Sequence, residues 1–209
     1  MSPSVHTEPT KHMTRIAIVG AGQVGSALAY SLILGNIANE LILVDTKAHL
    51  RDGQVSDLSD VVCSGNGGTR IRSGTYHDAG QCDLIVVTAG SRYGIGETSV
   101  QHMYRKVSIL RSVVTAMRPF RPDAILLIVS NPVDLLTSLA QELSGLPLTQ
   151  VLGSGTLLDS VRLRGLLAEN TGVCFPIPEM KLKTWANWAN LTSTGCPQFN
   201  RSLRRRCSW

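Results

Sequence analysis

Residues 16–25 read Ile-Ala-Ile-Val-Gly-Ala-Gly-Gln-Val-Gly, and this stretch decides the fold. Its four apolar residues predict a short buried strand, and a Gly-x-Gly-x-x-Gly pattern follows them directly. A helix-like stretch then runs to Gly35. A strand, a glycine turn and a helix in this order are typical of the first unit of an α/β fold.

Further apolar runs at 41–44, 83–88 and 124–129 are continuous rather than alternating, as expected of parallel strands covered on both faces. Apolar residues at helical spacing between 100 and 117 predict one helix, and Asp134 is the expected N-cap of another that ends at Gly145. The alternation of strands and helices predicts a doubly wound parallel sheet, the Rossmann architecture.

Each glycine of the motif has an expected role in binding a dinucleotide. Gly20 permits the tight turn, Gly22 lets the backbone approach a pyrophosphate, and Gly25 allows the helix to pack closely. Gln23 and Val24 lie at the start of the helix, whose N-terminus attracts the anion. The alternative is a glycine turn in a similar domain that binds another ligand or none.

Asp45 lies at the end of the second apolar run, beyond the glycine motif. A carboxylate at this place can accept hydrogen bonds from the adenosine ribose hydroxyls, and it would repel a 2′-phosphate. The sequence therefore predicts NAD rather than NADP as the cofactor.

Three later segments make the pattern more specific. They are Thr88-Ala89-Gly90-Ser91-Arg92, Ser130-Asn131-Pro132-Val133-Asp134, and the stretch 153–162, which reads Gly-Ser-Gly-Thr-Leu-Leu-Asp-Ser-Val-Arg. Together with the glycine loop they resemble the L-lactate/malate dehydrogenase family, and the lactate branch most closely. The resemblance covers roughly residues 14–173. It implies hydride transfer between NAD and a small 2-hydroxy or 2-oxo acid.

The resemblance also implies roles for single residues. The turn of Thr88, Ala89 and Gly90 would lie against the cofactor, Arg92 would contact its phosphates, and Asn131 would sit near the nicotinamide ribose and the reacting oxygen.

In such enzymes Asp159 would orient a catalytic histidine and Arg162 would bind the substrate carboxylate through its guanidinium group. The spacing of these two residues places them on one helix face. An intrahelical ion pair exposed to solvent is the alternative interpretation of the same spacing.

Three departures from the family concern the catalytic chemistry and the choice of substrate. The family's catalytic histidine follows the Asp-x-x-Arg helix, whereas His6, His12, His49, His77 and His102 all precede Asp159. Ser99 stands where the family's loop has a carbonyl-polarising arginine, and Arg92 and Arg105 are the nearest alternatives. The glutamine that usually selects lactate is absent around Tyr93 and Gly94. His102 is expected to be exposed or packed rather than catalytic.

The net charge of +5 is not spread over the 209 residues. Residues 1–172 contain 14 Lys+Arg and 14 Asp+Glu, so the excess lies in residues 173–209, which also hold all three tryptophans. The extent of the family resemblance and this charge distribution together lead to the expected organisation of the chain. We expect a disordered tail at 1–13, the NAD-binding domain at 14–150, the start of a substrate domain at 151–172, and a tail without family pattern at 173–209.

The leading hypothesis is an L-lactate dehydrogenase-like oxidoreductase that is truncated before the catalytic histidine and inactive as a chain of this length. The alternatives are a catalytically dead NAD-binding module and a malate or other 2-hydroxy acid dehydrogenase. The zero net charge of residues 1–172 argues against nucleic acid as a partner, and no apolar run is long enough to cross a membrane. The sequence contains no Cys/His cluster of the kind that would indicate a metal site. We expect a cytoplasmic protein whose full-length relatives form homo-oligomers.

Overall fold

The computed structural model describes residues 14–64 and 68–172, which fall into two compact units that meet between Ser154 and Gly155. The expectations for the tails at 1–13 and 173–209 lie outside the described residues.

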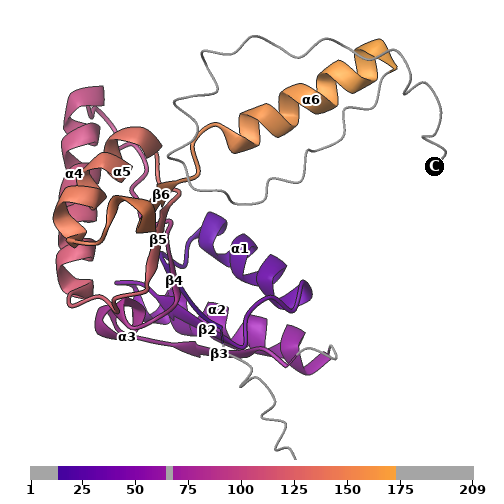
Figure 1. Ribbon diagram of the computed structural model, residues 1–209, viewed down its shortest axis with the longest axis vertical. Helices are drawn as coiled ribbons and strands as arrows, with labels where there is room; N and C mark the ends of the chain where they lie inside the picture. The colour runs from indigo at the N-terminus through magenta and orange to yellow at the C-terminus, as the bar shows by residue number, and fades with distance from the viewer. Residues whose placement is uncertain (1–13, 65–67, 173–209) are drawn as a thin grey trace, which may run out of the picture. The chain divides into compact units, whose positions relative to one another are not determined.

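The first unit is built on a six-stranded sheet (Figure 1). Its strands are β1 (Arg15–Val19), β2 (Glu40–Val44), β3 (Arg70–Ser73), β4 (Leu84–Val87), β5 (Ile125–Ile128) and β6 (Val151–Gly153). All five pairings are parallel, and the strand order is β3-β2-β1-β4-β5-β6. This confirms the predicted doubly wound sheet, with the reversal of strand order between β1 and β4.

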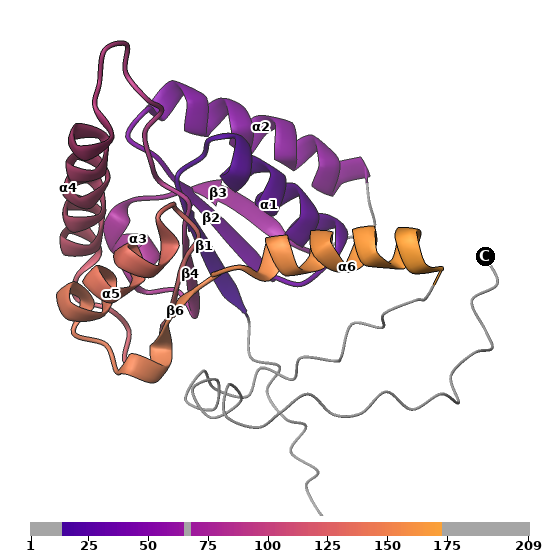
Figure 2. The ribbon, with the colours of Figure 1, turned by 90° about the horizontal axis from the view of Figure 1, so that it is seen from above.

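Five helices of the first unit cover the sheet on both faces. They are α1 (Gln23–Leu34), α2 (Ala48–Ser64), α3 (Tyr76–Gly80), α4 (Ser99–Met117) and α5 (Val133–Ser144), and a 3-10 turn, η1 (Leu148–Gln150), precedes β6. Figures 1 and 2 show α1 and α2 on one face and α3, α4 and α5 on the other.

Two apolar cores follow from this layering, because successive residues of a strand point to opposite faces. Ile16 and Ile18 of β1 pack with Ala29 and Ile33 of α1 in one core. Their neighbours Ala17 and Val19 join the helices on the other face, where Leu110, Val114, Met117, Leu136 and Ala140 are buried. Strands buried on both faces therefore explain the continuous apolar runs in the sequence.

Two helix predictions need refinement. Helix α5 begins at Val133 with Pro132 as its N-cap, so the prediction that Asp134 caps it is wrong, and Asp134 lies in the first turn. Its end is as predicted, since Gly145 adopts a left-handed conformation with φ of 72°. Along α4 the apolar stripe is buried only from Leu110 onward, whereas Val100 remains 64% exposed.

The boundary expected at 150/151 falls just before β6. This strand pairs with β5, with Leu126 opposite Val151, so it is part of the sheet of the first unit. The second unit contains α6 (Leu157–Thr171), a single described helix on which no residue is buried. Among the described residues no helix is long and apolar enough to cross a membrane, and no group of metal-ligating side chains occurs.

Candidate functional site

The glycine loop joins β1 to α1 at the carboxyl edge of the sheet. Gly20 has a φ of 111°, which side-chain-bearing residues rarely adopt, and a Cβ on it would lie 2.6 Å from the main-chain nitrogen of Ala89. A Cβ on Gly25 would lie 2.0 Å from the carbonyl oxygen of Gly20. Both positions therefore require glycine for the turn and for close packing of the helix, as the sequence predicted.

Gly22 differs from these two glycines, because a Cβ on it would meet no atom within 4 Å. It is the N-cap of α1, and no side chain caps the free N–H groups of the first turn, where Gln23 and Val24 are exposed. No acidic residue lies in that turn. Open space beside unsatisfied N–H groups at a helix N-terminus fits a bound diphosphate.

Asp45 follows β2 and holds the glycine loop through its carboxylate. Its Oδ2 accepts a hydrogen bond from the main-chain N–H of Ala21 at 2.8 Å, and its Oδ1 accepts one from the N–H of Lys47 at 2.8 Å. The side chain is half-buried. The carboxylate is thus fixed beside the glycine loop, with lone pairs left over for a ribose hydroxyl.

The turn of residues 88–90 lies next to the glycine loop. The hydroxyl of Thr88 donates a hydrogen bond to the carbonyl oxygen of Gly20 at 2.8 Å, which ties the ends of β4 and β1 together. The hydroxyl of Ser130, after β5, donates to the carbonyl oxygen of Ala89 at 2.6 Å. Gly90 is exposed and would have free space around a Cβ. The loops after β1, β4 and β5 therefore meet at the point where the strand order reverses.

Asn131 follows Ser130 and is exposed at the same edge of the sheet. It directly precedes Pro132, through a cis peptide bond. Its position at the end of β5, beside the β4 turn, is compatible with the expected contact to the nicotinamide side of the cofactor.

Between β4 and α4 the chain forms the loop of residues 91–98. Arg92 is exposed, and Ser99 is exposed at the first position of α4. Arg105 pairs with the carboxylate of Glu97, so this arginine is engaged within the loop region.

Glu97 is the one carboxylate of this loop, and both of its oxygens have partners. Its Oε2 accepts a hydrogen bond from the N–H of Gly94 at 2.8 Å and lies 3.2 Å from Nδ1 of His102. The Gly94 hydrogen bond, followed by the charge of Arg105, lowers the pKa of Glu97. His102 is buried, so of the two expectations for it, exposed or packed, the second is confirmed. Sequence reasoning missed Glu97, because its partners are brought together only by the turn of the loop.

In the second unit, Asp159 and Arg162 face each other on α6. Oδ1 of Asp159 lies 3.9 Å from Nη1 of Arg162, and their side chains are 76% and 68% exposed. The spacing therefore places them on one helix face, as expected from sequence.

A family model described as "lactate/malate dehydrogenase, NAD binding domain" matches residues 14–153. These residues are the six-stranded sheet and its helices. The chain belongs to the lactate/malate dehydrogenase family.

Relatives within this family carry the name of the lactate branch. The chain is 46% identical over 151 residues to L-lactate dehydrogenase A of Rhizopus oryzae. The aligned region covers 72% of the chain and 47% of that protein. It is 38% identical over 213 residues to L-lactate dehydrogenase A of Hordeum vulgare. This aligned region covers 97% of the chain and 58% of that protein. The chain thus spans about half the length of these curated relatives.

Solved structures agree with this placement. A minor L-lactate dehydrogenase from Enterococcus mundtii, crystallised with bound ligands, superimposes with a TM-score of 0.73 at 35% identity. A lactate dehydrogenase from a deep-sea metagenome library of the Medee basin gives 0.72 at 34% identity. Each covers 77% of the chain and matches 51% of its own length. NAD, the cofactor in the family model's description, is the one that the sequence predicted.

Proposed function

We propose that residues 14–153 bind NAD(H) for hydride transfer to and from a small 2-hydroxy or 2-oxo acid. One observation carries the proposal most strongly. The Asp45 carboxylate, the uncapped start of α1 and the Thr88 turn converge on the glycine loop, at the reversal of strand order. This is the place where doubly wound sheets bind dinucleotides.

The residues of the loop have distinct parts in binding. The first N–H groups of α1 would hold the pyrophosphate in the open space beside Gly22, and Asp45 would accept hydrogen bonds from the adenosine ribose. Arg92 would add charge to the phosphates, and Asn131 would contact the nicotinamide side. The cofactor itself, when bound, supplies the hydride acceptor and donor.

The substrate class rests on the relatives. Those named above are L-lactate dehydrogenases, so we propose lactate and pyruvate as the substrate pair of the enzyme to which this domain belongs. Arg162 would bind the substrate carboxylate and Asp159 would orient a histidine. Homo-oligomers and a cytoplasmic location are proposed on the same family basis.

The residues present support cofactor binding better than turnover. No histidine follows Asp159, and Ser99 offers no charge to polarise a carbonyl group. His102 is buried against Tyr93 and Glu97, so it is not available as a general acid in the described conformation. We therefore propose that these 209 residues by themselves are an NAD-binding module.

The test compares NADH and NADPH in fluorescence titrations of the whole chain. Saturable NADH binding with much weaker NADPH binding supports the proposal, because Asp45 repels a 2′-phosphate. Equal binding of both nucleotides would remove the assigned role of Asp45, and absence of binding would overturn the proposed function.

A further inference from the structure

A buried carboxylate in the loop of residues 91–98, that of Glu97, links this loop to α4 in addition to the capping of the helix by Thr98. The side chain of Glu97 is 6% exposed, and burying a carboxylate is costly unless its oxygens are paired. Its partners come from both sides of the junction, since Gly94 belongs to the loop and His102 and Arg105 belong to α4. Loss of Glu97 would therefore remove the contacts that join Gly94 to His102 and Arg105.

Apolar packing does little to hold the loop. Ile95, at its tip, is fully exposed, and Gly96 has a φ of 76° with open space around it. Among the described residues, the ring contact of this loop is that of Tyr93, whose ring stacks on the imidazole of His102 with centroids 3.9 Å apart and an interplanar angle of 21°. Tyr93 is otherwise 60% exposed. Apart from the capping of α4 by Thr98, the loop conformation thus depends on Glu97 and on this stack.

Arg92 lies next to Tyr93 and two residues before Gly94. It is exposed, whereas the residues that follow it are anchored by the stack and by the hydrogen bond to Glu97. A cation on an anchored backbone loses less conformational freedom on binding than one on a mobile segment. The anchoring of the loop therefore bears directly on how strongly Arg92 can bind phosphate.

We propose that Glu97 is a positioning residue for cofactor binding, which acts through Gly94, His102 and Arg105 to hold the loop so that Arg92 faces the cofactor phosphates. Tyr93 supports the same conformation by stacking on His102. This inference rests on the proposed NAD binding, and it adds a residue that contacts no cofactor but sets the affinity for it.

The first measurement needs no cofactor. Amide hydrogen exchange of the whole chain is followed by NMR for wild type, Glu97→Ala and Tyr93→Leu. We expect the Gly94 amide to exchange about tenfold faster in Glu97→Ala, because its acceptor is gone, and less so in Tyr93→Leu. Tyr93→Leu removes an exposed ring and so provides a variant that keeps the core intact. Unchanged exchange in both variants overturns the proposal.

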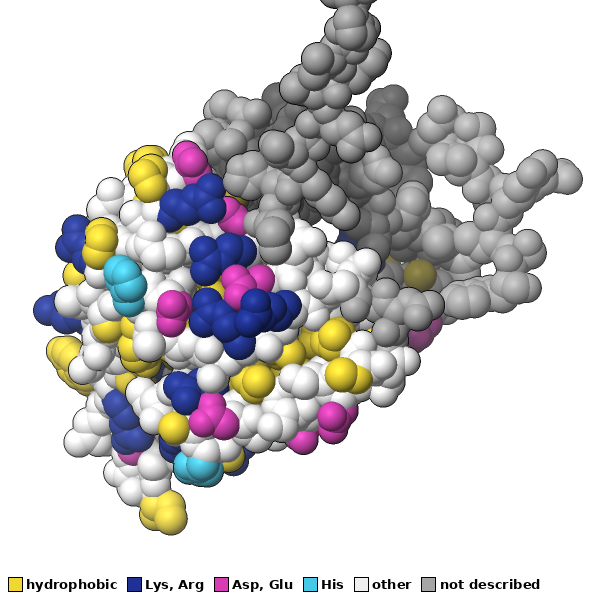
Figure 3. All heavy atoms as spheres, turned by 90° about the horizontal axis from the view of Figure 1, so that it is seen from below, with side chains coloured by type: hydrophobic (Ala, Val, Ile, Leu, Met, Phe, Trp, Pro, Cys, Tyr) yellow, Lys and Arg dark blue, Asp and Glu magenta, His cyan; other side chains and the backbone are white. Residues whose placement is uncertain are grey.

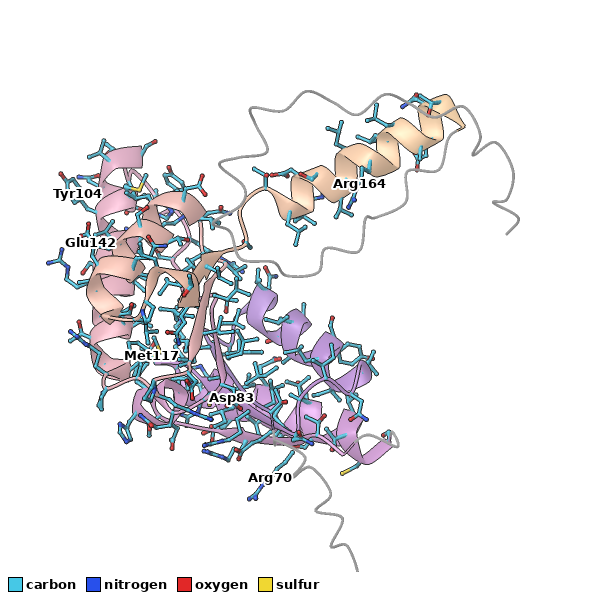
Figure 4. All side chains as sticks on the ribbon, in the orientation of Figure 1. Arg70, Asp83, Tyr104, Met117, Glu142 and Arg164 are labelled. Atoms are coloured by element: carbon cyan, nitrogen blue, oxygen red, sulfur yellow. The ribbon has the colours of Figure 1, made fainter. Side chains whose placement is uncertain are left out.

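The second measurement is a double-mutant cycle on NADH affinity. We expect Glu97→Ala and Arg92→Ala each to weaken binding about tenfold, and the double variant to be no weaker than either alone, because Glu97 acts through Arg92. Additive losses would overturn the proposal by showing that the two residues act independently. Glu142→Ala is the matched control, since Glu142 is an exposed glutamate on α5 (Figure 4).

The two proposals fail in different ways. If wild type does not bind NADH, the proposed function fails, whatever the exchange of Gly94 shows. If wild type binds NADH and the losses are additive, only the positioning role of Glu97 fails.

Discussion

The carboxylate of Asp45 accepts a hydrogen bond from the main-chain N–H of Ala21 at 2.8 Å. This bond joins the end of β2 to the middle of the glycine loop, 24 residues earlier in the chain. The same carboxylate is the group expected to select NAD. Asp45 therefore shapes the loop, and we propose that it also binds the ribose, so its substitutions should affect structure and cofactor specificity to different degrees.

Asp45→Asn should separate these two effects. The amide oxygen can still accept one of the two main-chain hydrogen bonds, while the negative charge is lost. We expect NADH affinity to fall about tenfold and the preference for NADH over NADPH to shrink, because a 2′-phosphate is no longer repelled. Parallel titrations with both nucleotides measure this. An unchanged preference would show that another group selects the cofactor.

The two glycines at the start of α1 should respond in opposite ways to alanine. A Cβ on Gly25 would lie 2.0 Å from a main-chain oxygen, so Gly25→Ala should destabilise the fold by about 1–3 kcal/mol. Gly22→Ala meets no protein atom within 4 Å, so it should lower stability only by the N-cap preference for glycine over alanine, about 1 kcal/mol or less. It should nevertheless weaken NADH binding strongly, since its Cβ fills the space for the pyrophosphate.

Thermal unfolding and NADH titration of both variants check this prediction. Gly53→Ala on α2 is the control, because it also meets no atom within 4 Å and lies outside the glycine loop. Normal NADH binding by Gly22→Ala would argue against the assigned pyrophosphate position.

At the opposite edge of the sheet, Glu40 joins Arg15 of β1 and Arg72 of β3 with distances of 2.9 and 2.8 Å. Figure 3 shows acidic and basic side chains interleaved on a face of the molecule. The hydrogen bond from Arg72, followed by that from Arg15, lowers the pKa of Glu40 below the ordinary value of a glutamate. The contribution of Glu40 to the free energy of unfolding is therefore fully present above the ordinary pKa of a glutamate, and it is lost as the pH falls through the lowered pKa.

Glu40→Gln should accordingly lower the free energy of unfolding by about 1–2 kcal/mol at pH 7. The difference from wild type should shrink as the pH falls below the ordinary range for a glutamate. Urea unfolding at several pH values tests this, with Glu142→Gln as an exposed control. A difference that stays constant down to the most acidic pH would show that the effect is not one of charge.

Two cysteines of the described residues should differ in reactivity. Burial raises the pKa of Cys82 to about 11, and its thiol donates a hydrogen bond to the carbonyl oxygen of Asp78 at 3.4 Å. Cys63 is exposed near the end of α2. Alkylation at pH 8 followed by peptide mapping should modify Cys63 in the native chain, and Cys82 only in denaturant. Equal labelling of both in the native chain would contradict the described packing.

Much of the fold could be predicted because it is encoded locally. The continuous apolar runs of β1, β2, β4 and β5 identified central strands, since strands covered on both faces need apolar residues throughout. The edge strand β3 reads Arg-Ile-Arg-Ser and gave no such signal. Helix α3 has only five residues, and the capping box of Thr75 with Asp78 was the signal that could have revealed it.

The site shows the same division between local and long-range information. The glycines and Asp45 could be recognised because their roles follow from motif and spacing. The hydrogen bonds from Thr88 to Gly20 and from Ser130 to Ala89 join residues that are 68 and 41 positions apart, so no local pattern predicts them. The pairing of Asp159 with Arg162 follows from helical spacing, while their contact with substrate stays a prediction.

The absence of a histidine after Asp159 leads to an expectation about turnover. With saturating NADH and pyruvate, the 209-residue chain should show no pyruvate-dependent loss of NADH absorbance. Intact L-lactate dehydrogenase in the same assay is the positive control. Oxidation that persists in a highly purified sample, and that His102→Leu abolishes, would instead assign His102 a role in catalysis.

The most direct test of the central claim is a fluorescence titration of the purified chain with NADH. The account predicts saturable binding that Gly22→Ala and Asp45→Asn weaken, because the glycine loop and its carboxylate form the cofactor site. A folded chain that shows no saturable NADH binding would contradict the account.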